Sequence, residues 1–178
     1  GNEFHSSGNI AADGSFTDAF SEVYDNEVYP VGTLRYESAD SVKETAGHSG
    51  DRVWVFVKAV GAIAAFTVVK RDTSGSAALP PYSGSTAGGA ALDITLLGVA
   101  QTAIADTKYG WIVKRGVCKT TSSAAITKGA HLITAASGKV DDVTLAAVTP
   151  SQGAMIIGQA LEEALAGDAA VNAYISIP

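Results

Sequence analysis

The sequence predicts an all-β protein, and three observations support this prediction. Val53 to Val60 is a run of β-branched and aromatic residues with no glycine or proline to interrupt it. The residues from Val171 to Ile177 alternate apolar and polar side chains, as in a strand with one buried face. Short turns rich in Gly, Ser and Asp separate such runs. We therefore expect a sandwich or barrel of short antiparallel strands.

Residues 1–29 are expected to form an extended N-terminal arm, followed by a β domain over residues 30–178. The arm is rich in Gly, Ser, Asn and Asp and keeps no period, yet aromatic residues are spaced along it. Such side chains anchor segments to surfaces because they bury large areas. A short helix from Thr17 to Tyr24, packed on the chain's own domain, is the alternative. The predicted partner-binding residues are Phe4, Phe16, Phe20, Tyr24 and Tyr29.

Within the β domain, strands are expected where apolar runs are bounded by turn residues. Residues 37–50 are polar and residues 73–91 are rich in Gly, Ser and Pro, so both segments are expected to be loops. Residues 155–166 are ambiguous, because an extended start is followed by Leu161–Leu165, which could form a helical turn. The expected strands and apolar segments are residues 30–36, 53–60, 62–70, 92–101, 109–120, 124–135 and 171–177.

A weak internal repeat suggests two similar β modules. Each copy consists of a strand, a turn of small residues, a second strand and a Ser-Gly turn. We expect submodules of residues 30–75 and 92–178, joined by the Gly/Ser/Pro loop; chance similarity between two Ala-rich hairpins is the alternative. The first copy comprises residues 57–59, 62–64, 68–69 and 74–75, and the second comprises residues 118–120, 125–127, 132–133 and 137–138.

The charge distribution limits the partners that the chain can bind. Residues 1–30 hold six acidic and no basic side chains, and they carry the whole formal charge of -6, because the remaining residues are balanced. Nucleic acids and anionic membranes attract clustered Lys and Arg, which are missing here. We therefore expect no nucleic-acid partner and no membrane partner. No apolar run approaches the length of about 18 residues that a transmembrane helix needs.

Composition also favours a surface that is covered in the working state. Charged residues make up 17% of the chain, against about 25% in typical soluble proteins. A poorly charged surface is typical of proteins that associate with themselves or with a partner. The first 30 residues contain no apolar stretch of the kind found in a secretory leader. We therefore expect a homo-oligomer that is made and assembled in a cytoplasm.

Reactive side chains show no catalytic or metal-binding pattern. Cys118 is the one cysteine, so it forms no intrachain disulfide, and we expect it to be a buried apolar residue. His5, His48 and His131 are far apart and match no metal-binding spacing. No nucleophile elbow, phosphate loop or dinucleotide fingerprint is present. The sequence predicts no catalytic, cofactor-binding or metal-binding residues.

The remaining polar and aromatic candidates are expected to have structural roles. Residues 141–142 and 162–163 are adjacent acidic pairs, and neighbours in a strand point to opposite faces, so neither pair converges on one substrate. A distant pair of carboxylates facing across a cleft would be needed for glycosidase chemistry. Trp54 and Trp111 could stack on a sugar, but aromatic residues in strands are more often part of a core or an interface.

Several short motifs resemble those of a known family. They occupy residues 98–101, 109–112, 116–117, 126–130, 137–140, 157–162 and 167–168. With these motifs, residues 92–178 resemble the β-rich decoration, or cement, proteins of tailed-phage heads. The resemblance is weaker over residues 30–72 and absent in the arm. It implies an oligomer, often a trimer, that binds the outside of the capsid shell and stabilises it, and it implies no catalytic residues.

The sequence therefore predicts a non-enzymatic virion structural protein on the outer capsid surface of a bacteriophage. Its expected partners are the major capsid protein and further copies of itself. Each copy would bury apolar surface across a junction between capsomers, and many linked contacts would stabilise the shell. Two alternatives are a tail or fibre adhesin that binds carbohydrate through Trp54 or Trp111, and a β-rich hydrolase whose carboxylates are scattered in the sequence.

Overall fold

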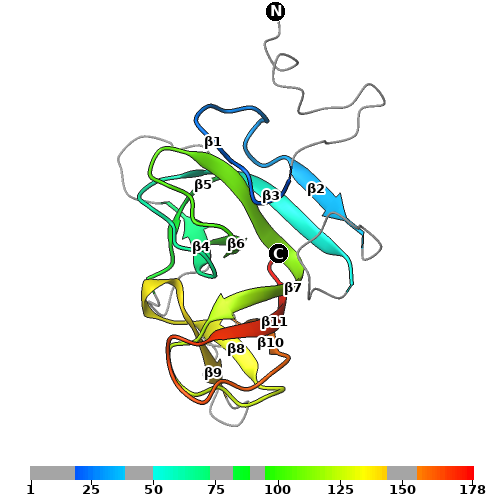
Figure 1. Ribbon diagram of the computed structural model, residues 1–178, viewed down its shortest axis with the longest axis vertical. Helices are drawn as coiled ribbons and strands as arrows, with labels where there is room; N and C mark the ends of the chain where they lie inside the picture. Colours follow the sequence, from blue (N-terminus) through cyan, green and yellow to red (C-terminus); the bar gives the residue numbers. More distant parts are fainter. Residues whose placement is uncertain (1–18, 39–49, 73–81, 89–94, 144–155) are drawn as a thin grey trace, which may run out of the picture.

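A computed structural model of the chain describes residues 19–38, 50–72, 82–88, 95–143 and 156–178. The described residues are almost entirely strand and turn, apart from one 3-10 turn at Ala136–Gly138, which confirms the all-β prediction (Figure 1). The strands are β1 (Val23–Tyr24), β2 (Leu34–Glu37), β3 (Arg52–Ala59), β4 (Val68–Arg71), β5 (Ser83–Thr86), β6 (Leu96–Ala100), β7 (Tyr109–Thr121), β8 (His131–Thr134), β9 (Val140–Val143), β10 (Ile156–Ala160) and β11 (Ala170–Ser176).

All eleven strands belong to one hydrogen-bonded sheet, and part of this sheet closes on itself. Its order is β2-β3-β5-β4-β6-β7-β11-β10-β8-β9, with β1 added to β7. An additional pairing between β3 and β7 closes β3, β5, β4, β6 and β7 into a ring. We call this ring barrel 1. Closure removes free strand edges, which is the advantage of a barrel over an open sheet.

The second half of β7 belongs to a second ring. β7 pairs with β11, followed by β10, β8 and β9. A parallel bridge between Ser122 and Val140 then joins β9 back to the end of β7, and the N–H of Ser123 donates to the carbonyl of Val140 at 2.8 Å. We call this ring barrel 2. Figure 1 shows barrel 1 above barrel 2, with the 13-residue strand β7 running from one into the other.

The two barrels have the same topology and the same register, apart from a β-bulge at Lys114 in the β3–β7 pairing that the β7–β11 pairing lacks. β4, β5 and β6 correspond to β8, β9 and β10, and the first half of β7 corresponds to β11. The second half of β7 corresponds to β3. A β-bulge at Leu97 recurs at Ile157. Three pairs of Cα partners show the equivalence. The pair Ala100–Ile112 in barrel 1 corresponds to Ala160–Ala173 in barrel 2. In the same way, Arg71–Gly84 corresponds to Thr134–Val140, and Trp54–Val113 corresponds to Val117–Tyr174.

The turns at the ends of the barrels repeat as well. Ile63 and Ile104 exchange two backbone hydrogen bonds of 2.9 Å in barrel 1, and Ile126 and Ala164 exchange bonds of 2.8 and 2.9 Å in barrel 2. Each of these four residues is followed, three or four positions later, by a residue with positive φ. These are Phe66 (62°), Thr107 (66°), Gly129 (84°) and Asp168 (64°). The fold therefore contains an internal repeat, but its units differ from the expected submodules of residues 30–75 and 92–178. β6 and the first half of β7 belong to barrel 1, because they pair with β4 and β3.

The predicted alignment of the repeat is correct at one point and wrong at two others. The predicted match of residues 57–59 with residues 118–120 is wrong by two residues, because the pairing partners make Val57 the counterpart of Thr120. Ile63 corresponds to Ile126, as expected from the sequence. The predicted match of Val68 with Leu132 is wrong, because the pairing partners make Val69 the counterpart of Leu132. Since the side-chain period in a strand is two, this shift decides which residue faces the barrel interior. Val69 and Leu132 are both fully buried.

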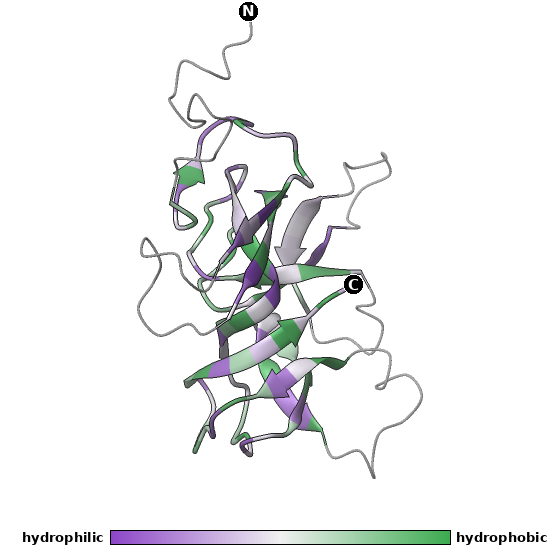
Figure 2. Cartoon of the chain, turned by 90° about the vertical axis from the view of Figure 1, so that its right-hand side faces the viewer, coloured by the Kyte–Doolittle hydropathy of each residue, from purple (hydrophilic) through white to green (hydrophobic). Residues whose placement is uncertain are grey.

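Two apolar clusters form the core. The first contains Val55, Val57, Ile63, Val69 and Ile112, which come from different sides of the ring of barrel 1 and therefore fill its interior. The second is larger: it includes Trp54, Phe56 and Trp111 on the outer face of barrel 1, and it continues into barrel 2. Figure 2 shows the alternation of hydrophobic and hydrophilic residues along the strands that supplies these two faces.

Three details differ from the sequence prediction. Ser83–Thr86, within the segment expected to be a loop, is strand β5. Leu161–Leu165 is not helical but forms turns around a bridge at Ala164. The strands are not all antiparallel, because β5 pairs with β3 in parallel, and the Ser122–Val140 bridge is parallel too. Small residues make β5 hard to recognise, since Ser and Gly have low strand propensity and are typical of turns.

Candidate interaction surface

The outer edge of β2 carries two of the exposed large apolar side chains in the part of the chain that the structure describes. β2 lies at one end of the strand order and pairs with β3 alone. Leu34 is 42% exposed and Tyr36 is 73% exposed, whereas Glu37 on the opposite face is buried. Soluble proteins usually protect such an edge with charges or with proline, because an apolar edge invites pairing with another strand. The β2 edge is therefore a candidate interaction surface.

The hydrogen-bond pattern shows which backbone groups this edge presents. The N–H of Phe56 donates to the carbonyl of Thr33 at 2.9 Å. Residues of an antiparallel strand alternate between bonding to their partner and facing away. With the register Leu34–Val55 and Tyr36–Val53, Leu34 and Tyr36 are the residues that face away. Their N–H and C=O groups point to the open edge, beside their own exposed side chains.

An aromatic cluster holds the segment that leads into β2. Phe20 stacks on Trp54, with ring centroids 4.5 Å apart, and meets the edge of Trp111 at 6.3 Å. Tyr29 contacts both Phe56 and Trp111, each with ring centroids 5.4 Å apart. These rings lie in the larger apolar cluster. Residues 19–33 are therefore packed onto the outer face of barrel 1.

The aromatic residues predicted to bind a partner are thus placed differently from one another. Phe20 and Tyr29 are buried in the chain's own core, and Tyr24 is half-buried against it. In this fold these rings contact β3 and β7 of their own chain. Phe4 and Phe16 lie outside the described residues. The segment at residues 19–24 is not the helix considered as an alternative, because it forms a turn followed by the short strand β1.

A buried polar group fixes β2 to β3 beneath this edge. Trp54 Nε1 donates to Glu37 Oε2 at 2.6 Å, and Arg52 Nε lies 3.5 Å from the same oxygen. The side chains of Arg52 and Glu37 are 4% and 0% exposed. A buried carboxylate needs partners of this kind, because an unpaired buried charge costs several kcal/mol. Glu37 therefore orients β2 so that Leu34 and Tyr36 face outward.

Acidic side chains lie on the segment before β2 and at the start of β3. Glu22 and Glu27 are exposed, as is Asp51, next to the end of β2. Asp25 is paired with Lys108, with 2.8 Å between Oδ1 and Nζ. A partner that carries basic residues beside an apolar strand would complement this surface.

The reactive side chains singled out in the sequence have structural environments in the described part of the chain. Cys118 is buried, and burial raises the pKa of its thiol to about 12, partly offset by the charge of Arg52. His131 is half-buried on β8. No group of three or more His, Cys, Asp or Glu residues that could hold a metal ion occurs among the described residues. His5 and His48 lie outside them.

The acidic pairs bind backbone groups. Asp142 Oδ2 accepts a hydrogen bond from the N–H of Thr127 at 3.2 Å, and Asp141 Oδ1 accepts one from the N–H of Asp142 at 3.0 Å. Glu162 Oε1 accepts one from the N–H of Asn172 at 2.7 Å. These carboxylates support turns and strand ends. Across the described ranges there is also no helix long and apolar enough to cross a membrane.

Trp54 and Trp111 cannot serve as a sugar-binding platform in this fold. They are 2% and 1% exposed, and both lie within the aromatic cluster. A sugar stacks on an exposed ring face, so these two side chains do not supply the carbohydrate-binding surface considered in the adhesin alternative. Sequence reasoning missed Leu34 and Tyr36, although an apolar–polar alternation from Leu34 to Glu37 was available as a signal.

The chain is similar in fold to a solved structure. No protein-family model matches the chain, and no curated protein matches it. Among solved structures, the chain is similar to the N-terminal base of the head fibre protein gp8.5 of bacteriophage phi29. The two are 18% identical, with a TM-score of 0.49, over 70% of this chain and 94% of the other. At this identity and TM-score, the similarity assigns neither a family nor a function.

Proposed function

We propose that the protein is a non-enzymatic structural protein of a phage virion, which binds the outer capsid surface and stabilises the head. The open apolar edge of β2 carries this proposal. It offers backbone hydrogen-bonding groups together with two exposed apolar side chains, Leu34 and Tyr36. A strand or extended loop of the major capsid protein would add to β2, so that main-chain hydrogen bonds supply affinity and side-chain contacts supply specificity.

The motifs that resemble those of phage cement proteins support the same proposal. They lie in β6, β7 and β10 and in the turns that precede β8, β9 and β11, and β7 is the strand that the two rings share. The acidic residues beside β2 favour a basic partner surface. They disfavour direct pairing of two β2 edges, because like charges would then approach each other.

Self-association is expected through another surface. A monomer of 18.0 kDa in light scattering at all concentrations would contradict self-association.

Binding to heads that lack the protein tests the proposal. Tyr36→Lys places a charge on the open edge, as natural proteins do to prevent strand addition. We expect this variant to remain folded, because the side chain is exposed, and to cosediment with heads at an occupancy at least tenfold lower. Tyr174→Lys is the matched control, since Tyr174 is 45% exposed on β11 of barrel 2.

A backbone variant separates strand addition from side-chain contact. Tyr36→Pro removes an N–H that points away from β3, so the pairing of β2 with β3 stays intact while the outward donor is lost. Head binding should fall for this variant as well, and it should fall further at high salt, because exposed charge pairs are screened over about 8 Å at physiological ionic strength. Equal occupancy of wild type and both Tyr36 variants would refute the role of the β2 edge.

A further inference from the structure

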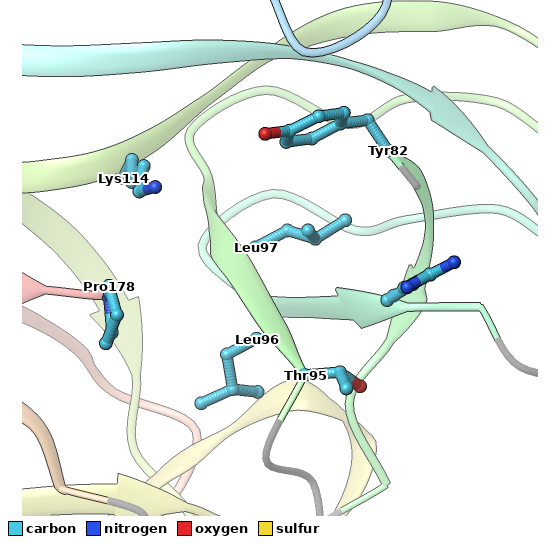
Figure 3. Close-up of a pocket in the computed structure, with 7 residues that line it drawn as sticks. Tyr82, Thr95, Leu96, Leu97, Lys114 and Pro178 are labelled. Carbon is cyan, nitrogen blue, oxygen red and sulfur yellow. The ribbon is translucent and has the colours of Figure 1, made fainter. Parts of the chain in front are cut away.

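One end of barrel 1 is open and forms a cavity of about 240 Å³. Figure 3 shows Lys114 and Pro178 on one side of this space and Leu97 and Leu96 along β6, with the hydroxyl of Tyr82 directed toward the side on which Lys114 lies. Its lining residues come from the end of β4, the middle of β7, the starts of β5 and β6, and the C-terminal residue. They are Arg71, Tyr82, Thr95, Leu96, Leu97, Lys114 and Pro178. Mouths of β-barrels are common positions for ligand sites.

The internal repeat shows that the fold does not require this opening. From the pairing registers, Arg71 corresponds to Thr134 and Leu97 to Ile157. Lys114 follows Val113 as Ile175 follows Tyr174 and so takes the place of Ile175, but Lys114 is the extra residue of a β-bulge that barrel 2 lacks. These three counterparts in barrel 2 are 3%, 2% and 0% exposed. The same end of barrel 2 is therefore sealed by buried side chains. At these positions barrel 1 has the cationic residues Lys114 and Arg71, where barrel 2 has Ile175 and Thr134.

The β-bulge contributes to the shape of the cavity. Leu97 is the extra residue between Leu96 and Gly98, so it is not opposed by a residue of β4. Its side chain packs against the interior cluster of barrel 1. Gly84 on β5 gives it room, because a Cβ at that position would approach Leu97 Cδ1 to 3.4 Å and Val69 Cγ1 to 2.6 Å. Leu97 thus forms an apolar floor below the cationic rim.

The rim of the cavity has an excess of positive charge. Its lining contains Arg71 and Lys114 but no acidic residue. Neither side chain makes an ion pair or a hydrogen bond within the described structure. This contrasts with a chain whose formal net charge is -6. The hydroxyls of Tyr82 and Thr95 add neutral donors. Two cations and two hydroxyls beside an apolar floor suit an anion that has an apolar part.

We propose that the mouth of barrel 1 binds a carboxylate attached to a small apolar group. The carboxylate would accept charge-assisted hydrogen bonds from Lys114 and Arg71, while its apolar part would cover Leu96 and Leu97. A cavity of about 240 Å³ is below the usual range of about 300–1,000 Å³ for drug-sized ligands. The ligand is therefore a small molecule, or the terminal carboxylate of a peptide with an apolar last residue. This site is independent of the proposed attachment to heads.

The test uses 3-phenylpropionate as a probe and its neutral amide, 3-phenylpropionamide, as the matched ligand. Titration of the ¹⁵N-labelled full chain should shift the amide resonances of Leu97 and Lys114 in a saturable way with the carboxylate. The amide should bind at least tenfold more weakly, because it cannot make the charge-assisted bonds. Equal affinity for the two ligands, or no saturable shift with the carboxylate, would overturn the proposal.

Variants locate the site and distinguish the sources of the carboxylate. Lys114→Ile copies the residue of barrel 2, so we expect a folded protein with at least tenfold weaker binding. Lys128→Ile is the control, because Lys128 is exposed in a turn of barrel 2. Unchanged binding by Lys114→Ile, or equal loss in both variants, would refute the site. If Lys114→Ile fails to fold, Arg71→Gln gives the same test. A peptide ending in free Phe, compared with its amidated form, then shows whether chain termini also enter.

Discussion

Replacing Phe20 by alanine tests whether the segment before β2 is part of the core. Phe20 is 9% exposed and lies between two partners: its ring stacks on Trp54, and the guanidinium carbon of Arg35 lies 3.9 Å from its centroid. Truncation removes buried apolar area, a stacked pair and a cation–π contact at once. A deletable arm would not lose stability in this way, so the measurement separates the two descriptions of this segment.

The Phe20→Ala substitution is expected to lower the free energy of unfolding strongly, because three contributions are lost together. Phe→Ala substitutions in cores cost about 3–5 kcal/mol, which includes the cavity left behind. Aromatic pairs contribute about 0.5–1.5 kcal/mol beyond burial, and a desolvated cation–π contact contributes up to about 2 kcal/mol. Phe20→Leu keeps most of the apolar volume and should cost about 1–2 kcal/mol. These losses are substantial against a typical total stability of about 5–15 kcal/mol.

Urea denaturation followed by tryptophan fluorescence is a suitable assay, because Trp54 and Trp111 both belong to the cluster that Phe20 joins. Val23→Ala is the control, since Val23 lies on the same segment but is 39% exposed. It should change the free energy of unfolding by less than about 1 kcal/mol. If Phe20→Ala unfolds with the same free energy as Val23→Ala, the assignment of residues 19–33 to the core is refuted.

Three further predictions concern the interior. Gly158→Ala should destabilise the protein by about 2–3 kcal/mol in the same assay, because its Cβ would collide with the carbonyl of Tyr174, and Gly98→Ala should behave alike. Glu37→Ala should cost about 3–5 kcal/mol in thermal unfolding, since it leaves the charge of Arg52 buried without its partner. Burial raises the pKa of Cys118 from 9.0 to about 12, so the unfolded thiol ionises first. The contribution of the buried thiol to the free energy of unfolding is therefore complete below pH 9. Between pH 9 and about pH 12 this contribution declines, by up to about 1.4 kcal/mol per pH unit. In the Cys118→Ala variant, the free energy of unfolding measured in urea should depend less steeply on pH between pH 8 and 10. The same pH dependence in wild type and variant would contradict the role of the buried thiol.

Regular alternation made most strands predictable from the sequence. Val53–Val60 and Val171–Ile177 have strong apolar patterns, and both are strands within one residue at each end. β5 was missed because its Ser, Gly and Thr side chains are small, and its place in the sheet depends on pairing with distant β3 and β4. Local propensity does not encode such long-range pairing.

The internal repeat was visible in part, and a stronger signal for it was overlooked. Leu97-Gly98-Val99-Ala100 and Ile157-Gly158-Gln159-Ala160 share their pattern of branched residue, glycine and alanine. These segments carry the equivalent bulges. The interaction surface was less predictable, because the burial of Phe20 and Tyr29 and the exposure of Tyr36 depend on which face of barrel 1 the segment covers. One sequence shows the aromatic residues but not their side of the sheet.

The sharing of β7 by both barrels makes the architecture extensible. β11 pairs with the second half of β7 as the first half of β7 pairs with β3, and the register is the same except for a β-bulge at Lys114 in barrel 1. After its pairing with β3 in barrel 1, β7 continues past Arg115. Gly116, with a φ of 117°, leads it into barrel 2, where it is the first strand. A further module of the same plan would begin on β11 in the same way. Repetition of that fixed relation would produce a rod whose neighbouring modules are joined by a continuous strand, with no flexible linker between them.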